Sequence, residues 1–408
     1  MRLLQVTDPQ EVLRIIEDNF KPLPLENVPL IQAGGRILGE DISSREDVPG
    51  FNRSTVDGYA VASRDTFGAQ GGLPAILSCL GEIVMGQTAP STGPGKCYLI
   101  HTGGMLPPGS DAVVMVEDTE SMGTIINCYR QVAPGENVIH RGEDLAAGEQ
   151  VLAAGCRLRA PELGLLASIG ITEVAVHRRP VIGILSSGDE LVPYQTDNLL
   201  PGQIRDCNAV ALSYLGQQAG ATVKSGGIMP DSFPRFLEQC RSFLEEIDFL
   251  VLSGGSSVGT RDYTARTLQE LGPPGLLVEG VAVQPGKPTL LASCCRKPVL
   301  GLPGHPVSAL IIFYLFGRAV IRRLCGQGKP LYSPSVIATL TRNVTSRIGR
   351  AEYIRVKLRL NNGLVEASPV FGRSGMLRTL SEAHGIIAIA PEKEGLLEGD
   401  MVEVTLWE

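Results

Sequence analysis

The chain has 408 residues and a mass of 43.4 kDa, so a typical size of roughly 150 residues per domain predicts two to four domains. Hydrophobic residues make up 43% and charged residues 19% of the sequence, values that exclude disorder as the main state. The net charge of −7 includes no concentrated basic run, which argues against broad binding of nucleic acid or of an anionic membrane.

Cysteine spacing and the N-terminus predict a cytoplasmic protein. The nine cysteines form no C-x-x-C motif, and the adjacent Cys294 and Cys295 do not match a zinc pattern. Such spacing favours reduced thiols in a reducing compartment. The N-terminus reaches the polar Asp8 too soon for a signal peptide, and the most apolar stretch, 307–316, is about half of a membrane span.

The first predicted element is a helix that begins after Asp8. Asp8 is a typical N-cap, Pro9 suits the first helical position, and Glu11 completes a capping-box pattern three residues after the cap. Apolar residues then recur at helical spacing until Pro22 ends the helix.

Beyond this helix the pattern of the chain changes several times. Short apolar runs separated by glycines predict a small β module over 47–140. Apolar strands alternate with amphipathic helices between 180 and 324, which is typical of a parallel sheet covered by helices. The remainder, 330–408, alternates apolar and polar residues around an Asn-Asn-Gly turn and predicts a hairpin-rich β module.

Three strands of the predicted parallel sheet run directly into loops rich in glycine or proline. Such loops gather at the carboxyl ends of the strands, where open α/β folds bind ligands. Glycine lets backbone N–H groups approach an anion closely, so these loops predict a phosphate-binding site. Their residues are Ser187, Gly188 and Asp189; Ser253, Gly254, Gly255, Ser256, Ser257 and Gly259; and Pro303, Gly304, His305 and Pro306.

Carboxylates accompany these loops. Glu190 and Asp262 lie at the same predicted edge, and the β module adds Asp57 and Asp144 beside glycines. Acidic side chains near a phosphate loop suit a hard cation such as magnesium, which takes oxygen ligands and bridges to phosphate. An isolated Asp-Gly is usually a solvated turn, so neither motif alone establishes a site.

A competing pattern is the sequence G-x-S-x-G at 255–259, which follows a strand and precedes a helix as in a hydrolase nucleophile elbow. Ser257 would be the nucleophile, and His305 or His384 the base. The pattern arises easily in a glycine-rich loop, and no histidine has a neighbourhood that marks it as a base. A dinucleotide-dependent oxidoreductase is less favoured, because no strand is followed by G-x-G-x-x-G.

In chain order, seven motifs together resemble the molybdopterin molybdenumtransferase family, which includes the bacterial MoeA proteins and the gephyrin E domain. Each motif is weak alone, but their shared order over essentially the whole chain is specific. The motifs are Asn-Arg-Ser-Thr-Val-Asp-Gly-Tyr-Ala at 52–60, His-Thr-Gly-Gly at 101–104, Arg-Gly-Glu-Asp at 141–144, Ser-Ser-Gly-Asp-Glu-Leu at 186–191, Ser-Gly-Gly at 253–255 with Asp262, Pro-Gly-Lys-Pro at 285–288 and Pro-Gly-His-Pro-Val-Ser at 303–308.

This resemblance implies a multidomain α/β plus β protein that forms an elongated homodimer. The expected parts are an N-terminal helix and extended linker domain (1–46 and 141–178), an inserted β domain (47–140), a parallel-sheet α/β molybdopterin-binding domain (179–327) and a C-terminal β barrel (328–408). The implied reaction joins molybdate to adenylylated molybdopterin with Mg²⁺ and releases AMP. Other candidate partners are a molybdopterin adenylyltransferase and molybdoenzyme maturation factors.

The resemblance also assigns site residues by position. Asp57, Thr102 and Asp144 resemble the polar site residues of the β and linker domains. Their counterparts from the α/β domain are Glu190, Asp231 and Asp262, of which Glu190 and Asp262 are expected to hold magnesium or to orient the attacking water. The two sets are expected to face each other across the dimer interface. Lys287, Arg355 and Ser374 are similar to the positions that contact anions in the family.

The chain departs from the family at three positions. Ser187 stands where Thr is usual, His305 where Asn is usual, and Gln284 where a Lys often precedes Pro-Gly-Lys-Pro. The third change removes a cation from the expected oxyanion pocket. A non-catalytic binding or scaffolding protein of the same fold is the alternative function, although retention of the acidic set favours catalysis.

Overall fold

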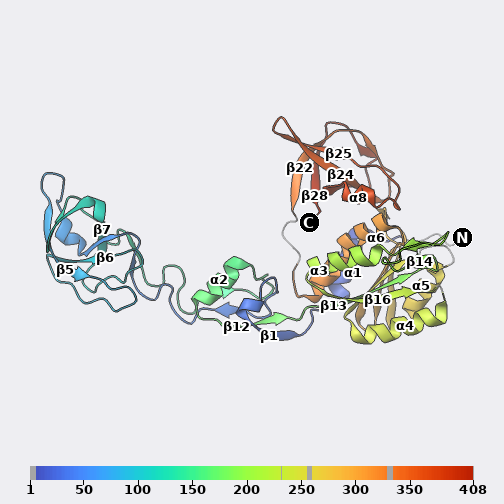
Figure 1. The fold of residues 1–408 in the computed structure, drawn as a ribbon, viewed down its shortest axis with the longest axis horizontal. Coiled ribbons are helices and arrows are strands. Elements are labelled where there is room, and N and C mark those ends of the chain that lie inside the picture. Colours follow the sequence, from blue (N-terminus) through green and yellow to red (C-terminus); the bar gives the residue numbers. More distant parts are fainter. Residues whose placement is uncertain (1–5, 231, 255–259, 329–333, 408) are drawn as a thin grey trace.

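A computed structural model of the chain describes residues 6–230, 232–254, 260–328 and 334–407. These residues form an elongated molecule (Figure 1). A β-sheet body lies at one end of the long axis, a small linker occupies the middle, and an α/β body with a β barrel beside it forms the other end. The predicted combination of α/β and β architecture is confirmed.

The β-sheet body at the far end is a six-stranded sheet with the order β7-β4-β6-β5-β9-β8. Gly58 opens β4 and must be glycine, because an added Cβ would lie 2.0 Å from the carbonyl oxygen of Val114 in the paired strand β7. The short strands that the sequence predicts here are confirmed. The elements are β3 (Arg53–Ser54), β4 (Gly58–Val61), η2 (Ser63–Thr66), β5 (Ala75–Glu82), β6 (Lys96–Ile100), β7 (Ala112–Met115), η3 (Val116–Asp118), β8 (Thr119–Met122), β9 (Ile125–Cys128) and β10 (Val138–Ile139), which pairs with β3.

The linker is built from two separated stretches of chain. Antiparallel pairing joins β1 to β12 and β2 to β11, so the linker contains both the way into the β body and the way back. Leu38, Leu158, Leu166 and Val176 form its small buried core. Its elements are β1 (Leu25–Pro29), η1 (Leu30–Gln32), β2 (Ile42–Ser43), β11 (Gln150–Leu152), α2 (Ala160–Ser168) and β12 (Glu173–His177).

The α/β body contains a six-stranded sheet with the order β16-β13-β17-β21-β20-β18. The first four strands are parallel, as predicted, while β20 and β18 form an antiparallel hairpin at one side. The last helical stretch of this body, which ends at Leu324, is interrupted by a π-helical segment. The elements are β13 (Val181–Ser187), α3 (Asn208–Gln218), β16 (Thr222–Met229), α4 (Phe233–Glu246), β17 (Phe249–Gly254), α5 (Thr260–Glu270), β18 (Pro274–Glu279), β19 (Val283–Gln284), β20 (Leu290–Cys294), β21 (Lys297–Leu302), α6 (Pro306–Ile312), η4 (Phe313–Gly317) and α7 (Arg318–Leu324).

The N-terminal helix α1 (Pro9–Asn19) packs against α7 in the core of the α/β body, although the sequence grouped it with the linker. Asp8 caps it as predicted, with its carboxylate 2.8 Å from the Gln10 amide nitrogen. The second half of the predicted capping box is wrong, because the carboxylate of Glu11 pairs with Arg14 at 3.1 Å instead of reaching back to the cap.

The C-terminal part is a closed barrel. Five strands follow one another in the order β24-β25-β22-β28-β26, and a further pairing of β26 with β24 closes the ring. Strand β19 of the α/β body pairs with β24, so one sheet spans both bodies. The remaining bounds are β22 (Ser335–Leu340), β23 (Val344–Thr345), β24 (Ala351–Asn361), β25 (Leu364–Pro369), α8 (Arg378–Ser381), β26 (Gly385–Ile389), β27 (Gly395–Leu396) and β28 (Met401–Leu406).

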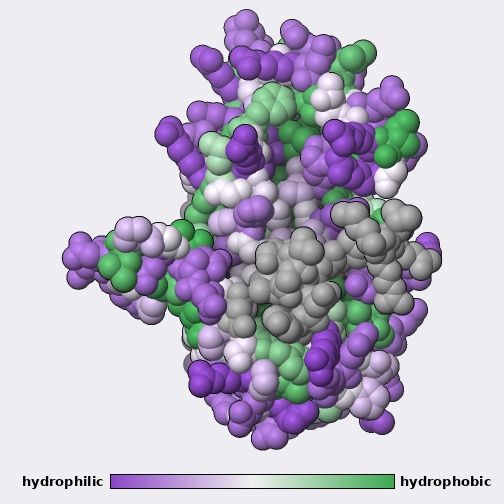
Figure 2. Space-filling view, turned by 90° about the vertical axis from the view of Figure 1, so that its right-hand side faces the viewer, coloured by the Kyte–Doolittle hydropathy of each residue, from purple (hydrophilic) through white to green (hydrophobic). Residues whose placement is uncertain are grey.

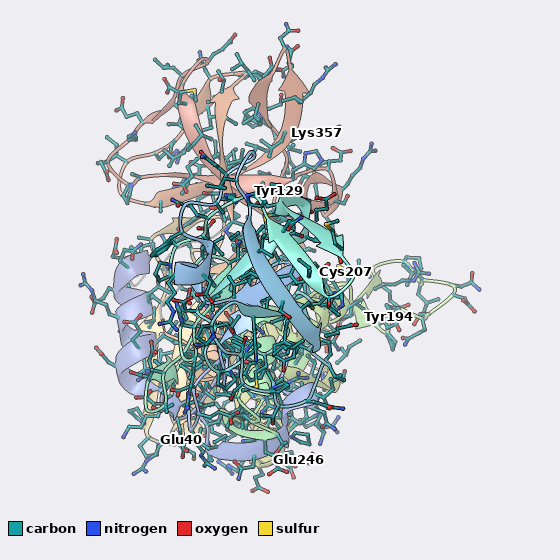
Figure 3. The ribbon with its side chains drawn as sticks, turned by 90° about the vertical axis from the view of Figure 1, so that its left-hand side faces the viewer. Glu40, Tyr129, Tyr194, Cys207, Glu246 and Lys357 are labelled. Carbon is teal, nitrogen blue, oxygen red and sulfur yellow. The ribbon has the colours of Figure 1, made fainter. Side chains whose placement is uncertain are left out.

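A narrow arm projects from the α/β body between β14 (Leu191–Val192) and β15 (Ile204–Arg205), which pair with each other. Tyr194 lies on this arm and is directed away from the body (Figure 3). The arm stands out to the left in Figure 2, where mostly hydrophilic residues cover the barrel and the α/β body. Within the described ranges, no helix has both the length and the apolar character needed to cross a membrane.

Candidate functional site

The loops after β13, β17 and β21 begin side by side at the carboxyl edge of the parallel sheet. Ser187 is level with Gly254, and Ser253 is level with Leu302, in the register of neighbouring strands. Gly254 has a φ of +108°, and an added Cβ would lie 2.2 Å from the carbonyl oxygen of Ser187. Only glycine fits where these two backbones meet, so the ends of β13 and β17 are in direct contact.

Asn208 fastens two of these loops together. It is the first residue of α3 and is 7% exposed. Its side-chain amide nitrogen lies 2.9 Å from the hydroxyl of Ser253 and 2.9 Å from the carbonyl oxygen of Gly304. The sequence indicated Asn208 only as the start of a helix, because its partners lie 45 and 96 residues away.

The loop after β13 carries Glu190 across the sheet edge. Gly188 is buried, and an added Cβ there would lie 2.7 Å from a carboxylate oxygen of Glu190. The amide of Leu191 donates to the carbonyl of Gly188 at 3.0 Å, which closes a tight turn. Glu190 and Asp189 are exposed. The turn therefore presents the Glu190 carboxylate to solvent at the carboxyl end of β13.

The loop after β21 also contacts the barrel. The Nδ1 atom of His305 lies 3.0 Å from the hydroxyl of Ser374, and the amide of Val307 donates to the carbonyl of Ser374 at 3.0 Å. His305 and Pro306 lead into α6, while Pro303 is buried beneath them. Ser374 is thus brought to the same edge from a distant part of the sequence.

Arg355 is more buried than an anion-contacting side chain at an open edge. It is 8% exposed, and burial lowers the pKa of its guanidinium. Its terminal nitrogen donates to the carbonyl of Gly372 at 3.0 Å, two residues before Ser374. Arg355 therefore holds the loop that positions Ser374.

Lys287 is exposed on the loop that follows β19. The loop is packed onto α6, because an added Cβ on Gly286 would lie 2.4 Å from Ile312. The peptide bond between Gln284 and Pro285 is cis. The next strand, β20, begins with Leu290 opposite Gly301, so Lys287 lies near the carboxyl end of β21.

Several predicted residues lie outside the described part of the chain. These are Asp231, Gly255, Ser256, Ser257 and Gly259. Asp262 belongs to α5, but the described structure does not include its side chain. Among the residues that are described, no group of three or more His, Cys, Asp or Glu side chains is placed to hold a metal ion.

A second polar cluster lies at the linker side of the β body. Asp57 accepts hydrogen bonds from the amide of Thr102 at 2.7 Å and from its hydroxyl at 3.1 Å. These bonds, the one from the amide first, lower the pKa of the Asp57 carboxyl. His101 lies between two acids, with Nδ1 3.6 Å from Asp57 and Nε2 3.0 Å from Glu82. Asp57 is therefore held as a carboxylate.

Asp144 is exposed on the turn next to this cluster. The amide of Arg141 donates to Asn52 at 2.8 Å, and the amide of Asp144 donates to the carbonyl of Val48 at 3.0 Å. The amide of Gly103 donates to the carbonyl of Ser54 at 2.8 Å. Three motifs distant in sequence thus meet at this place.

Within one chain the two polar clusters are separate. The cluster with Asp57, Thr102 and Asp144 belongs to the β body and its junction with the linker, whereas the sheet edge with Glu190 belongs to the α/β body at the other end (Figure 1). The structure brings Asp57 and Thr102 into contact and does not bring them near Glu190 within one chain.

The fold and the glycine-lined edge define a multidomain protein with an α/β ligand-binding body. Comparison with known families places its parts in one family. The MoeA N-terminal region (domain I and II) matches residues 7–170, a probable molybdopterin binding domain matches 183–323, and the MoeA C-terminal region (domain IV) matches 338–407.

Individual relatives agree over nearly the whole chain. The molybdopterin molybdenumtransferase of Haemophilus influenzae is 33% identical and covers 96% of both chains. Gephyrin of Dictyostelium discoideum is 30% identical over 98% of this chain and 62% of its own length. A crystal structure of a MoeA protein of molybdopterin biosynthesis from Pyrococcus horikoshii has a TM-score of 0.82, with 30% identity over 99% of this chain and 100% of that one.

The chain therefore belongs to the MoeA family of molybdopterin molybdenumtransferases, as its motifs indicated. It is an enzyme of molybdenum cofactor biosynthesis, with the multidomain architecture expected of that family.

Proposed function

We propose that the chain catalyses the insertion of molybdate into adenylylated molybdopterin, which forms molybdenum cofactor and releases AMP. The observation that carries this proposal is the carboxyl edge of the parallel sheet, where Asn208 fastens the loops of Ser253 and Gly304 into one surface. Backbone N–H groups of such loops bind phosphate oxygens. The relatives named molybdopterin molybdenumtransferase support the same activity.

The residues of this edge have different proposed roles, which depend on their charge. The loops after β13 and β17 would hold the phosphates of the adenylylated substrate, while exposed Lys287 suits a doubly charged oxyanion such as molybdate. Release of AMP requires water to add across the phosphoanhydride, so that one phosphate leaves with the adenosine and the other stays on the pterin. The carboxylates of Glu190 and Asp262 are the groups proposed to orient that water.

The described carboxylate at this edge, that of Glu190, suits magnesium. Mg²⁺ commonly keeps several waters and takes one or two carboxylates together with substrate phosphates. Glu190 offers one such carboxylate, exposed next to the buried Gly188 at the carboxyl end of β13. When bound there, the ion would neutralise charge on the phosphoanhydride, and Glu190 with Asp262 would hold it.

We also propose that the complete site is formed by two copies of the chain. Asp57, Thr102 and Asp144 belong to the opposite end of the molecule from Glu190, so a homodimer would allow one copy to supply each set. The elongated shape favours this arrangement, because antiparallel copies related by a two-fold axis place the β body of one beside the α/β body of the other.

A direct assay tests the reaction. The pure protein is incubated with adenylylated molybdopterin, Mg²⁺ and either molybdate or tungstate, and AMP release is followed together with activation of a cofactor-free molybdoenzyme. Glu190→Gln and Asp262→Asn should abolish most activity, whereas Glu40→Gln, which removes an exposed carboxylate of the linker, should not. If neither oxyanion gave AMP, the chain would be a binding or scaffolding protein of the same fold.

Mixing two inactive variants tests the shared site. Random exchange of Asp57→Asn with Glu190→Gln copies makes about half of the dimers mixed, and each mixed dimer regains one intact site. Activity should return to about a quarter of the wild-type value. If light scattering reports a monomer, or if mixing restores no activity, the two sets of residues do not form a site shared between copies.

We further place this activity in the cytoplasm, where a molybdopterin adenylyltransferase could deliver the substrate and maturation factors could take up the product. All nine cysteines are free thiols, which supports a reducing compartment. The serine hydrolase alternative depends on Ser257, outside the described residues, and labelling of that residue by a fluorophosphonate probe would revive it.

A further inference from the structure

An arginine-lined cavity lies at the edge of the sheet opposite to the proposed active site. Its volume is about 720 Å³, and its wall combines the linker, the C-terminal end of α3 and the helix α7. Arg179 lies two residues before β13 and Ala221 one residue before β16, so the cavity lies at the amino ends of these strands. Six arginines line it: Arg36, Arg157, Arg159, Arg179, Arg318 and Arg322.

Three of the six arginines have partners that account for them. Arg36 donates to the carboxylate of Glu26 and, at 2.7 Å, to the carbonyl of His177. Arg159 pairs with Glu162 at 2.6 Å. Arg318 lies over the ring of Tyr314, with its guanidinium carbon 4.5 Å from the ring centre. These contacts are structural and leave the cavity open.

The other three, Arg157, Arg179 and Arg322, pair with no carboxylate of the described chain. Burial lowers the pKa of Arg322, and the like charge of Arg318 adds to this effect. Burial raises the pKa of the Cys325 thiol to about 11, although the guanidinium groups of Arg36, Arg179 and Arg157 act in the opposite direction. Arginines from the linker and from the α/β body therefore lie around the Cys325 thiol.

Such a cluster costs free energy in the unliganded protein. Arg157 and Arg179 are exposed and Arg322 is half-buried, so the cost comes from repulsion between like charges gathered around one cavity. Arginine stays protonated at any physiological pH, so the cluster cannot relieve this cost by losing a proton. A bound anion would relieve it, and planar guanidinium groups pair bidentately with phosphate oxygens. The volume falls within the range of small-molecule sites.

We propose that this cavity binds a small polyanion of the phosphate class, with a pyrophosphate group held by Arg157, Arg179 and Arg322. This site is distinct from the carboxyl edge of the sheet and does not depend on the proposed reaction. Because Arg157 belongs to the linker and Arg322 to α7, the bound anion joins the linker to the α/β body. Ligand concentration would thereby set how firmly these two parts are held together.

Titration calorimetry with sodium pyrophosphate at constant ionic strength tests the proposal. A second titration with ATP distinguishes inorganic pyrophosphate from a nucleotide as the ligand. Sodium sulfate serves as a divalent anion for comparison. Arg157→Gln and Arg322→Gln should each weaken binding at least tenfold. Arg64→Gln removes a 70% exposed arginine of the β body and should leave the affinity unchanged. Lys287→Gln should also leave it unchanged, because Lys287 is at the opposite edge.

Hydrogen exchange of the wild-type protein supplies a measurement that needs no variant. Pyrophosphate should protect the backbone near 35–37, 156–159 and 217–221, which line the cavity. The thermal unfolding midpoint separates a ligand site from a cluster that only stabilises the fold. If Arg322 serves a ligand, Arg322→Gln should unfold at the same temperature as the unliganded wild type or at a higher one. Loss of binding in Lys287→Gln with retention in Arg322→Gln would overturn the proposal, as would protection confined to 187–190.

Discussion

The side-chain amide of Asn208 donates to the hydroxyl of Ser253 at a distance of 2.9 Å, in a place where both residues are buried. The same amide group reaches the carbonyl of Gly304, so one side chain joins the helix α3 to β17 and to the loop after β21. The shape of the proposed phosphate-binding edge of the sheet depends on this contact.

Asn208→Asp should destabilise the protein. The change keeps the size of the side chain but removes the donor and places an acceptor against the Gly304 carbonyl. Leaving buried groups unpaired costs about 1–3 kcal/mol of unfolding free energy. Urea unfolding measures the loss, and Asn198→Asp on the exposed arm is the control. Equal midpoints for the two variants would show that the contact contributes nothing.

Thr102→Val should raise the pKa of Asp57 toward its ordinary value of 3.8 without reaching it. The hydroxyl bond is lost, but the backbone amide of residue 102, which is the larger cause of the lowered pKa, is still present. Carboxyl chemical shifts followed by NMR over a range of pH measure the change. A lowered pKa stabilises the folded state at pH values above the ordinary pKa of 3.8. The difference in unfolding free energy between the wild type and Thr102→Val should therefore shrink as the pH falls below 3.8.

His305→Asn should keep most activity, whereas His305→Leu should not. The side-chain amide of Asn can still hydrogen-bond to Ser374, which joins the loop after β21 to the barrel. Ser374→Ala removes the same contact from the other side and should resemble His305→Leu. AMP release at varied molybdate concentration compares the variants. Similar activity of Leu and Asn variants would mean that the contact has no part in the reaction.

Glu162→Gln should lose stability at neutral pH and not at low pH. Hydrogen bonds from the Arg159 side chain hold the pKa of Glu162 at about 2, compared with an ordinary value of 4.5. A lowered pKa stabilises the fold above 4.5, and this contribution disappears as the pH falls from 4.5 to about 2. Loss of this helix-start interaction costs about 1 kcal/mol at pH 7. Thermal unfolding at pH 7 and pH 3 tests whether the difference narrows.

The sequence predicted the elements of the fold well where the pattern was local. Alternating residues and the Asn-Asn-Gly turn predicted the hairpin of β24 and β25, in which Asn362 and Gly363 both have positive φ. Glycines marked the ends of the parallel strands. The motif at 52–60 brought Asp57 forward as a candidate, although one chain keeps it apart from Glu190.

Contacts between distant segments could not be predicted in the same way. The pairing of Asn208 with Gly304 depends on how α3 crosses the sheet. Arg355 occurs in an alternating strand that resembles a solvated face, yet the turn at Gly372 covers it. The cavity collects arginines from positions 36 to 322 and has no signature in any window of sequence.

The burial of α1 against α7 also has a consequence during synthesis. Val12, Ile16 and Phe20 face a core whose partners, including Val320 and Leu324, are about 300 residues further along the chain. At 5–20 residues per second the ribosome needs roughly 15–60 s to supply them. During that interval the apolar face of α1 lacks these partners, so this helix is completed long before the helix α7 that covers it.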